Sequence, residues 1–205
     1  MDTRPSDLRN AIRLSLFSVA WGGVAGLVAL VLAYDAGSLS LLGFGIDAII
    51  DSVASVALIW RFAIEERAPG RADRVERVAE QIVGGVLIAA AASLAVGAIR
   101  SLVAHVEVEA TIGAIVLLCA SVVVLPPLAI AKRRVASRLG SGALRADSLL
   151  TAAAALLAAV GLSSLLLTSV ARVWWADALG ALIIAALLAR EGITSAGLAR
   201  GKPAP

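Results

Sequence analysis

The uncharged stretch from Leu14 to Tyr34 restricts the possible folds more than any other feature of the sequence. It runs for 21 residues without a charge, which is long enough for a helix to cross the hydrocarbon core of a bilayer. It is also longer than the apolar core of a signal peptide, and no typical cleavage site follows it. We therefore predict a membrane-spanning helix at 14-34, preceded by the polar residues 1–13.

Five more apolar stretches follow, and they predict helices at 38-60, 78-103, 110-131, 143-170 and 172-189. Hydrophobic residues make up 60% of the chain and charged residues 16%, whereas a soluble domain averages about 45–50% and about 25%. The segments between the stretches are too short to fold alone. The predicted fold class is all-α, a polytopic membrane protein with six transmembrane helices. It forms one transmembrane domain, 1-205, with a short cytoplasmic tail at 190-205.

The basic residues are distributed unevenly about these helices. Of the 18 Lys and Arg residues, only Arg100, near the end of the third predicted helix, and Arg172, at the start of the sixth, lie toward the outer side of the predicted membrane domain. The other sixteen lie at the N-terminus, in the tail and in two predicted loops that begin at Arg61 and Lys132. Because Lys and Arg concentrate in cytoplasmic loops, both termini are expected to face the cytoplasm. The charge indicates membrane topology rather than a nucleic-acid surface.

Two carboxylates interrupt the second predicted helix. Asp47 and Asp51 are four residues apart and share one helix face, a stripe that Gly43 and Ser55 extend. A charge facing lipid costs at least about 2.5 kcal/mol, and like charges at this spacing repel each other. Since no Lys or Arg lies in the central part of any predicted span, we expect a bound cation to neutralise the pair.

Further candidate ligands lie in the fifth helix. Asp147 is in its second turn, and Thr151 lies one turn deeper. From the helical rise, Asp147 is expected about 12 Å on the cytoplasmic side of the bilayer centre, as a ligand, a gate carboxylate or an interfacial residue. The segment Asp147-Ser-Leu-Leu-Thr151 resembles Asp47-Ala-Ile-Ile-Asp51, as expected of an inverted transporter repeat.

Oxygen donors of this kind suit a hard or borderline divalent cation. Paired carboxylates also bind protons, so one site can hold either a metal ion or protons, which is the chemical basis of antiport.

Other residues remain as candidates or limits. Asp177, near the outer end of the sixth helix, and the segment around His105 remain open as exit-side or outer metal residues. The single cysteine, Cys119, excludes a thiolate cluster within the chain. Pro126-Pro127 predicts a kink or unwound last turns in the fourth helix.

Together these motifs resemble the transmembrane half of the cation diffusion facilitator (cation efflux) family, and a compact bacterial subgroup of it that lacks the cytoplasmic domain. The segment from Ser40 to Asp51 resembles the Asp-xxx-Asp motif of its helix 2. Leu144-Arg145-Ala146-Asp147 and Trp175-Ala176-Asp177-Ala178 resemble the starts of its helices 5 and 6. A partial likeness of Gly43–Asp47 to the Gly-x-Gly-Asp motif of intramembrane aspartyl proteases is off by one residue.

The resemblance implies a secondary transporter, not an enzyme, that exports divalent transition-metal cations by proton antiport with alternating access. Zinc is the expected ion, with manganese, iron, cobalt and cadmium open. It also implies no permanently bound cofactor, a homodimer formed through transmembrane helices, and a place in the bacterial cytoplasmic (inner) membrane.

The fifth helix departs from the family pattern. Members of the family usually supply the other half of the metal site there as His-xxx-Asp or Asp-xxx-Asp, but the aligned positions are Leu150 and Ala154, which cannot bind metal. The resemblance therefore implies an incomplete four-ligand site, in which Asp147, Thr151 or water substitutes. This leaves open an alternative function, a non-transporting membrane scaffold or regulatory subunit with a degenerate metal site.

Overall fold

The computed structural model consists of long α-helices, as the sequence predicts. It describes residues 4–36, 39–104, 112–171 and 175–201, although the side chains of some of these, notably 39–47, 164–171 and 175–177, are not described. The helices are α1 (Arg4–Ala36), α2 (Leu39–Arg67), α3 (Ala72–Ala104), α4 (Ile112–Leu139), α5 (Gly142–Ala171) and α6 (Trp175–Gly201). A short 3-10 turn, η1 (Pro69–Arg71), joins α2 to α3.

Several segments that we predicted as loops are helical. The predicted loop 61–77 is helical apart from Ala68 and η1, the predicted loop 132–142 is helical to Leu139, and the predicted tail continues α6 to Gly201. These predictions were wrong because apolar length limits the membrane span but does not end a helix. The segments contain good helix formers such as Ala, Arg and Leu, and some of their charged residues, among them Arg61 and Lys132, have partners on neighbouring helices.

Five stretches of described residues are long and apolar enough to cross a membrane: Arg4–Val31, Ala72–Val103, Ile115–Leu139, Gly142–Val160 and Ala178–Gly197. They belong to α1, α3, α4, α5 and α6. α2 is not among them, since its residues from Ala48 onward, where its side chains begin to be described, combine Asp51 with Arg61 and Glu65. The structure thus supports five of the six predicted spans by length and composition.

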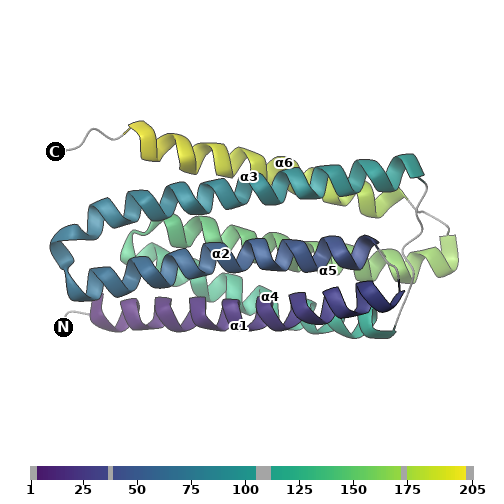
Figure 1. The fold of residues 1–205 in the computed structure, drawn as a ribbon, viewed down its shortest axis with the longest axis horizontal. Helices are drawn as coiled ribbons and strands as arrows, with labels where there is room; N and C mark the ends of the chain where they lie inside the picture. The colour runs from purple at the N-terminus through teal and green to yellow at the C-terminus, as the bar shows by residue number, and fades with distance from the viewer. Residues whose placement is uncertain (1–3, 37–38, 105–111, 172–174, 202–205) are drawn as a thin grey trace.

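The helices alternate in direction along the chain. The starts of α1, α3 and α5 therefore meet the ends of α2, α4 and α6 at one end of the molecule (Figure 1). We call this the basic end, because the residues that begin at Arg61 and Lys132 lie toward it. The closest packing is pairwise, between α1 and α2, α3 and α6, and α4 and α5, and α3 lies beside α6 along one edge of the molecule (Figure 1).

Glycine permits the close approach of α3 and α6. A Cβ atom built on Gly192 would lie 2.9 Å from the Gly84 carbonyl oxygen and 2.8 Å from Ile88 Cγ1. A Cβ on Gly84 would in turn lie 3.1 Å from the Gly192 carbonyl oxygen. Small residues at helix crossings let backbones approach in this way in membrane proteins, so these two glycines determine how tightly the α3–α6 pair can pack.

The turn between α4 and α5 is closed by two helix caps. Gly140 ends α4 with a positive φ of 66°, and the Ser141 amide donates to the Ala136 carbonyl at 3.1 Å, which is a Schellman arrangement. Ser141 Oγ then accepts a hydrogen bond from the Leu144 amide at 3.1 Å, as an N-cap residue does. These caps hold the last turns of α4 beside the first turns of α5.

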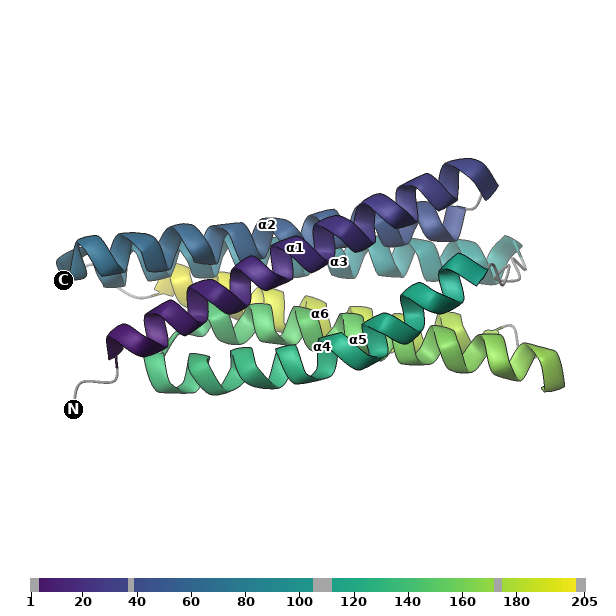
Figure 2. The same cartoon turned by 90° about the horizontal axis from the view of Figure 1, so that it is seen from below.

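Pro126 and Pro127 lie inside α4, and the helix continues for 12 residues beyond them. The predicted unwinding was therefore wrong. Figure 2 shows α4 changing direction about midway along its length, as the alternative prediction of a kink requires.

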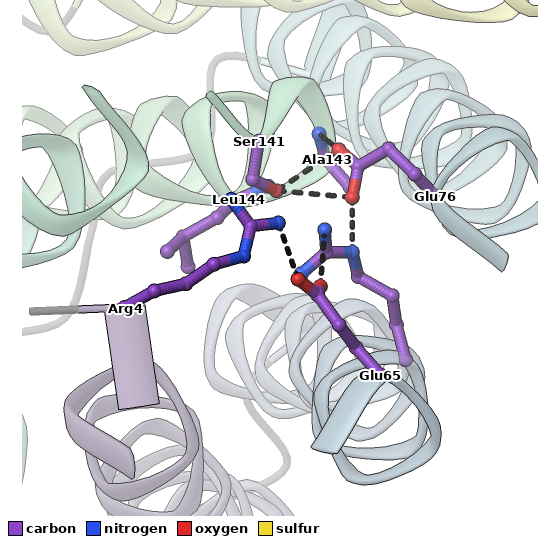
Figure 3. A network of polar contacts seen from close by, with 7 residues as sticks. Arg4, Glu65, Glu76, Ser141, Ala143 and Leu144 are labelled. Atoms are coloured by element: carbon purple, nitrogen blue, oxygen red, sulfur yellow. Dashed lines mark hydrogen bonds and ion pairs between the residues drawn. The ribbon is translucent and has the colours of Figure 1, made fainter. Parts of the chain in front are cut away.

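A buried network of charges ties four helices together at the basic end (Figure 3). Arg61 on α2 forms ion pairs with Glu65 at 2.9 Å and with Glu76 of α3, and Glu65 also pairs with Arg4 of α1. Glu76 reaches α5, where it accepts hydrogen bonds from Ser141 Oγ at 2.9 Å and from the Ala143 amide at 3.0 Å. The Arg61 and Glu65 side chains are each 4% exposed, so their charges are neutralised by each other rather than by water.

Candidate metal centre

The α2 carboxylates lie where the sequence places them, on continuous helix. The backbone of α2 is helical through both Asp47 and Asp51, which puts them one turn apart on one face. The Asp47 side chain lies outside the described ones. Asp51 is partly buried, and its Oδ1 atom is inaccessible and accepts no hydrogen bond from the described residues. A buried carboxylate oxygen without a donor is costly, so it is available to a bound ion.

α1 closes the side of α2 next to Asp51. A Cβ built on Gly22 would lie 3.0 Å from Ser52 Oγ, so a larger residue would push the helices apart. Ser52 Oγ donates to the Ala48 carbonyl within its own helix at 2.9 Å. The hydroxyl next to Asp51 in sequence is therefore already committed to the backbone.

Asp147 on α5 is completely buried and carries a basic partner. Its Oδ2 atom lies 2.6 Å from Nζ of Lys132 on α4, and both side chains have 0% exposure. Ser55 Oγ on α2 donates to Asp147 Oδ1 at 3.3 Å. The sequence analysis did not predict Lys132 as a partner of Asp147. It placed Lys132 in a loop, whereas α4 continues through Lys132 and carries it inward.

The helical phase of α4 explains this position. Lys132 is in register with the buried residues Leu125, Leu128, Val135 and Leu139, while Arg133 and Arg134 between them are exposed. Spacings of three and four residues place that whole series on one face. This periodicity in the sequence is the signal that could have identified Lys132 as an inward residue.

Thr151 is also engaged by Lys132. Lys132 Nζ donates to Thr151 Oγ1 at 3.0 Å, and Thr151 Oγ1 donates in turn to the Asp147 carbonyl at 3.1 Å. The ammonium thus bridges two successive turns of α5. Thr151 is 1% exposed, and water does not replace these contacts.

The contact between Ser55 and Asp147 shows where the candidate ligands of α5 lie along α2, relative to Asp51. Ser55 is one turn from Asp51, so Asp147 lies about 6 Å from the level of Asp51 along α2. That is half the offset expected from the predicted helix boundaries. One turn further along α5, Thr151 comes level with Asp51. Hydrogen bonds and an ion pair thus join Lys132, Asp147, Thr151 and Ser55 into one unit, one turn of α2 away from Asp51.

The two positions that the resemblance aligns with metal ligands, Leu150 and Ala154, lie in apolar surroundings. Leu150 is 5% exposed and belongs to the main core cluster, and Ala154 packs against the cluster of Leu125, Leu128 and Ala155. Among the described residues no three His, Cys, Asp or Glu side chains come together as a ligand group. The α5 side of the site therefore consists of Asp147 and Thr151, both held by Lys132.

Three further hydroxyls are buried in the apolar helices. Ser15 and Ser18 on α1 and Ser121 on α4 are at most 4% exposed, and their oxygens have no hydrogen-bond partner among the described residues. Sequence analysis did not single them out, because isolated serines in apolar helices carry no distinctive pattern.

The remaining predicted candidates stay predictions. His105 lies outside the described residues, and Asp177 lies in the first turn of α6 with its side chain outside the described ones. Cys119 on α4 is exposed.

Residues 14–196 match the family model described as the cation efflux transmembrane domain. No curated protein sequence matches this chain.

Proposed function

Since this chain belongs to the cation efflux family through its transmembrane domain, we propose that it exports a divalent transition-metal cation, with Asp47 and Asp51 as the ligands. The observation that carries the proposal is the buried Asp51 Oδ1 atom, which no described residue satisfies. Oxygen donors favour hard or borderline ions. Zinc is the first candidate, followed by manganese, iron, cobalt and cadmium.

The charge of the site supports a divalent ion. Asp47, Asp51 and Asp147 contribute three negative charges when ionised, and Lys132 contributes one positive charge. The net charge of the site is therefore two negative charges, which one divalent ion neutralises. An uncompensated charge in the hydrocarbon region is expensive, so the unloaded site requires either a cation or protons.

Protons are the natural replacement for the metal ion in this site. Two carboxylates one turn apart can hold protons when the metal leaves, which would couple export to proton entry. The site would then alternate between the two faces of the membrane. The N- and C-termini would lie in the cytoplasm with the basic end, as the distribution of Lys and Arg favours, and the membrane would be the bacterial cytoplasmic membrane. Homodimers would form through the transmembrane helices.

A flux assay tests the proposal. The purified chain is reconstituted into liposomes that contain a zinc-sensitive dye, and zinc uptake is compared for the parent, Asp47→Asn and Asp51→Asn. Asp73→Asn, at an exposed position of α3, is the matched control. Uptake is expected to vanish in the first two variants and to persist in the control. Uptake at the parent rate in both site variants would show that these carboxylates are not the ligands.

The alternative, a membrane scaffold or regulatory subunit with a degenerate metal site, is favoured by one specific observation. The α5 half of the site is occupied by the Lys132 ammonium, and Leu150 is packed in the apolar core. A purified protein that oligomerises but binds no zinc, manganese or cadmium would support this function over transport.

A further inference from the structure

The Lys132 ammonium is the one buried cation that the structure places beside the candidate metal centre, among the described residues. It has 0% exposure and lies 2.6 Å from Asp147 Oδ2 and 3.0 Å from Thr151 Oγ1. Both acceptors are the groups that would otherwise complete the α5 half of a metal site. An ammonium and a metal ion compete for the same oxygen atoms, because the ammonium donates hydrogen bonds to the lone pairs that a metal ion would coordinate.

The position of the ammonium distinguishes it from the ion pairs at the basic end. Arg61, Glu65 and Glu76 form their network where α2, α3 and α5 meet. Lys132 instead bridges from Asp147 to Thr151, and Asp147 accepts a hydrogen bond from Ser55, which lies one turn from Asp51 on α2. It therefore influences both halves of the candidate site.

We propose that Lys132 is a tethered cation that determines the affinity of the site: it withholds Asp147 and Thr151 from the transported ion and leaves the α2 carboxylates to bind it. The inference rests on the proposed function, since it concerns the same site. The ammonium occupies the two oxygen groups that α5 offers to the site, Asp147 and Thr151. In doing so it keeps the site from holding three free carboxylates, which would bind a divalent ion more tightly and release it more slowly.

A set of charge variants tests this role. Zinc and manganese binding to the full chain in lipid nanodiscs is measured by calorimetry for the parent, Lys132→Gln, Asp147→Asn, the double variant Lys132→Gln/Asp147→Asn, and Lys132→Arg. Lys132→Gln is expected to lower Kd about 10-fold, because affinity rises with the number of charged ligands. Asp147→Asn is expected to raise Kd about 10-fold, since the released ammonium then opposes the ion at Asp51.

The double variant and Lys132→Arg complete the comparison. The double variant removes one charge of each sign, so its Kd should stay within about 3-fold of the parent. Lys132→Arg keeps the positive charge and should also remain near the parent. A structural ion pair would lower folding yield in both single variants, but it would not shift Kd in opposite directions.

Folding of the variants is followed by size exclusion and far-UV circular dichroism. If Lys132→Gln does not fold, Asp147→Asn and the double variant decide, because both lack the Asp147 carboxylate and differ only in the ammonium. The double variant is then expected to bind zinc and manganese about 10-fold more tightly than Asp147→Asn does.

Equal Kd values for Asp147→Asn and the double variant would overturn the role of Lys132 while the α2 site stands. Shifts of Kd in the same direction in Lys132→Gln and Asp147→Asn would do the same. No binding by the parent or by any variant would overturn both the proposed function and this inference.

Discussion

Glu76 connects three helices at the basic end, and its removal should be the most destabilising change there. Its carboxylate pairs with Arg61 on α2 and accepts hydrogen bonds from Ser141 Oγ at 2.9 Å and the Ala143 amide at 3.0 Å on α5. Its side chain is 16% exposed. The variant Glu76→Ala removes all three contacts while keeping a good helix former in α3.

The magnitude follows from these contacts. A hydrogen bond to a charged group contributes about 1.5–3 kcal/mol, but Ser141 is still able to cap α5 through the Leu144 amide, and Arg61 keeps its pair with Glu65. We count the hydrogen bond to the Ala143 amide in full and the contacts with Ser141 and Arg61 in part. On this basis we expect Glu76→Ala to lower the free energy of unfolding by about 3 kcal/mol.

The assay is unfolding of the purified protein in mixed micelles by added sodium dodecyl sulfate, followed by far-UV circular dichroism. Glu66→Ala is the matched control, because Glu66 is exposed on α2 next to the buried Glu65 and its removal should leave the midpoint unchanged. If the two variants unfold at the same detergent fraction, the network in Figure 3 does not stabilise the fold and the reasoning fails.

Three smaller effects are expected from other contacts. Gly192→Ala should destabilise the α3–α6 pair by about 1–3 kcal/mol through overpacking, whereas Gly197→Ala, whose Cβ would meet nothing within 4 Å, should be neutral or slightly stabilising in the same unfolding assay. Ser55→Ala removes the 3.3 Å hydrogen bond to Asp147 and should lower the free energy of unfolding by about 1 kcal/mol in the same assay. Arg138→Ala should lower the free energy of unfolding by about 1 kcal/mol, since it leaves the Asp7 carboxylate of α1, whose side chain is 6% exposed, without its 3.4 Å ion pair; an unchanged unfolding midpoint would contradict this.

The location of Asp51 could be predicted closely from the sequence, and that of Asp147 only in part. Asp51 lies on an uninterrupted helix whose phase is set by local spacing alone, so the shared face with Asp47 and Ser55 follows from counting residues. The Ser55 hydroxyl does face a site group, Asp147. For Asp147, the predicted distance from Asp51 along the helix axes was too large. That distance depends on the axial position of α5 relative to α2, which is determined by contacts between residues distant in sequence.

The helix ends were the weakest predictions. We read the charged segments after Trp60, Ala131 and Ala189 as loops or tail, yet all three begin as continuations of helix. Hydropathy reports which residues tolerate lipid, and it contains no information about where a helix stops. That is decided by caps such as Gly140 and Ser141.

By itself, the sequence determined that this chain is an all-α membrane protein of the cation efflux type with a carboxylate pair on its second helix. Those conclusions rest on apolar length, local spacing and motif order, which are properties of neighbouring residues. Tertiary structure alone decided that Lys132 neutralises Asp147 and engages Thr151. A charge in the chain has no partner until the helices pack, because the electrostatic cost of burying it is offset only by a group brought within a few ångströms by the fold.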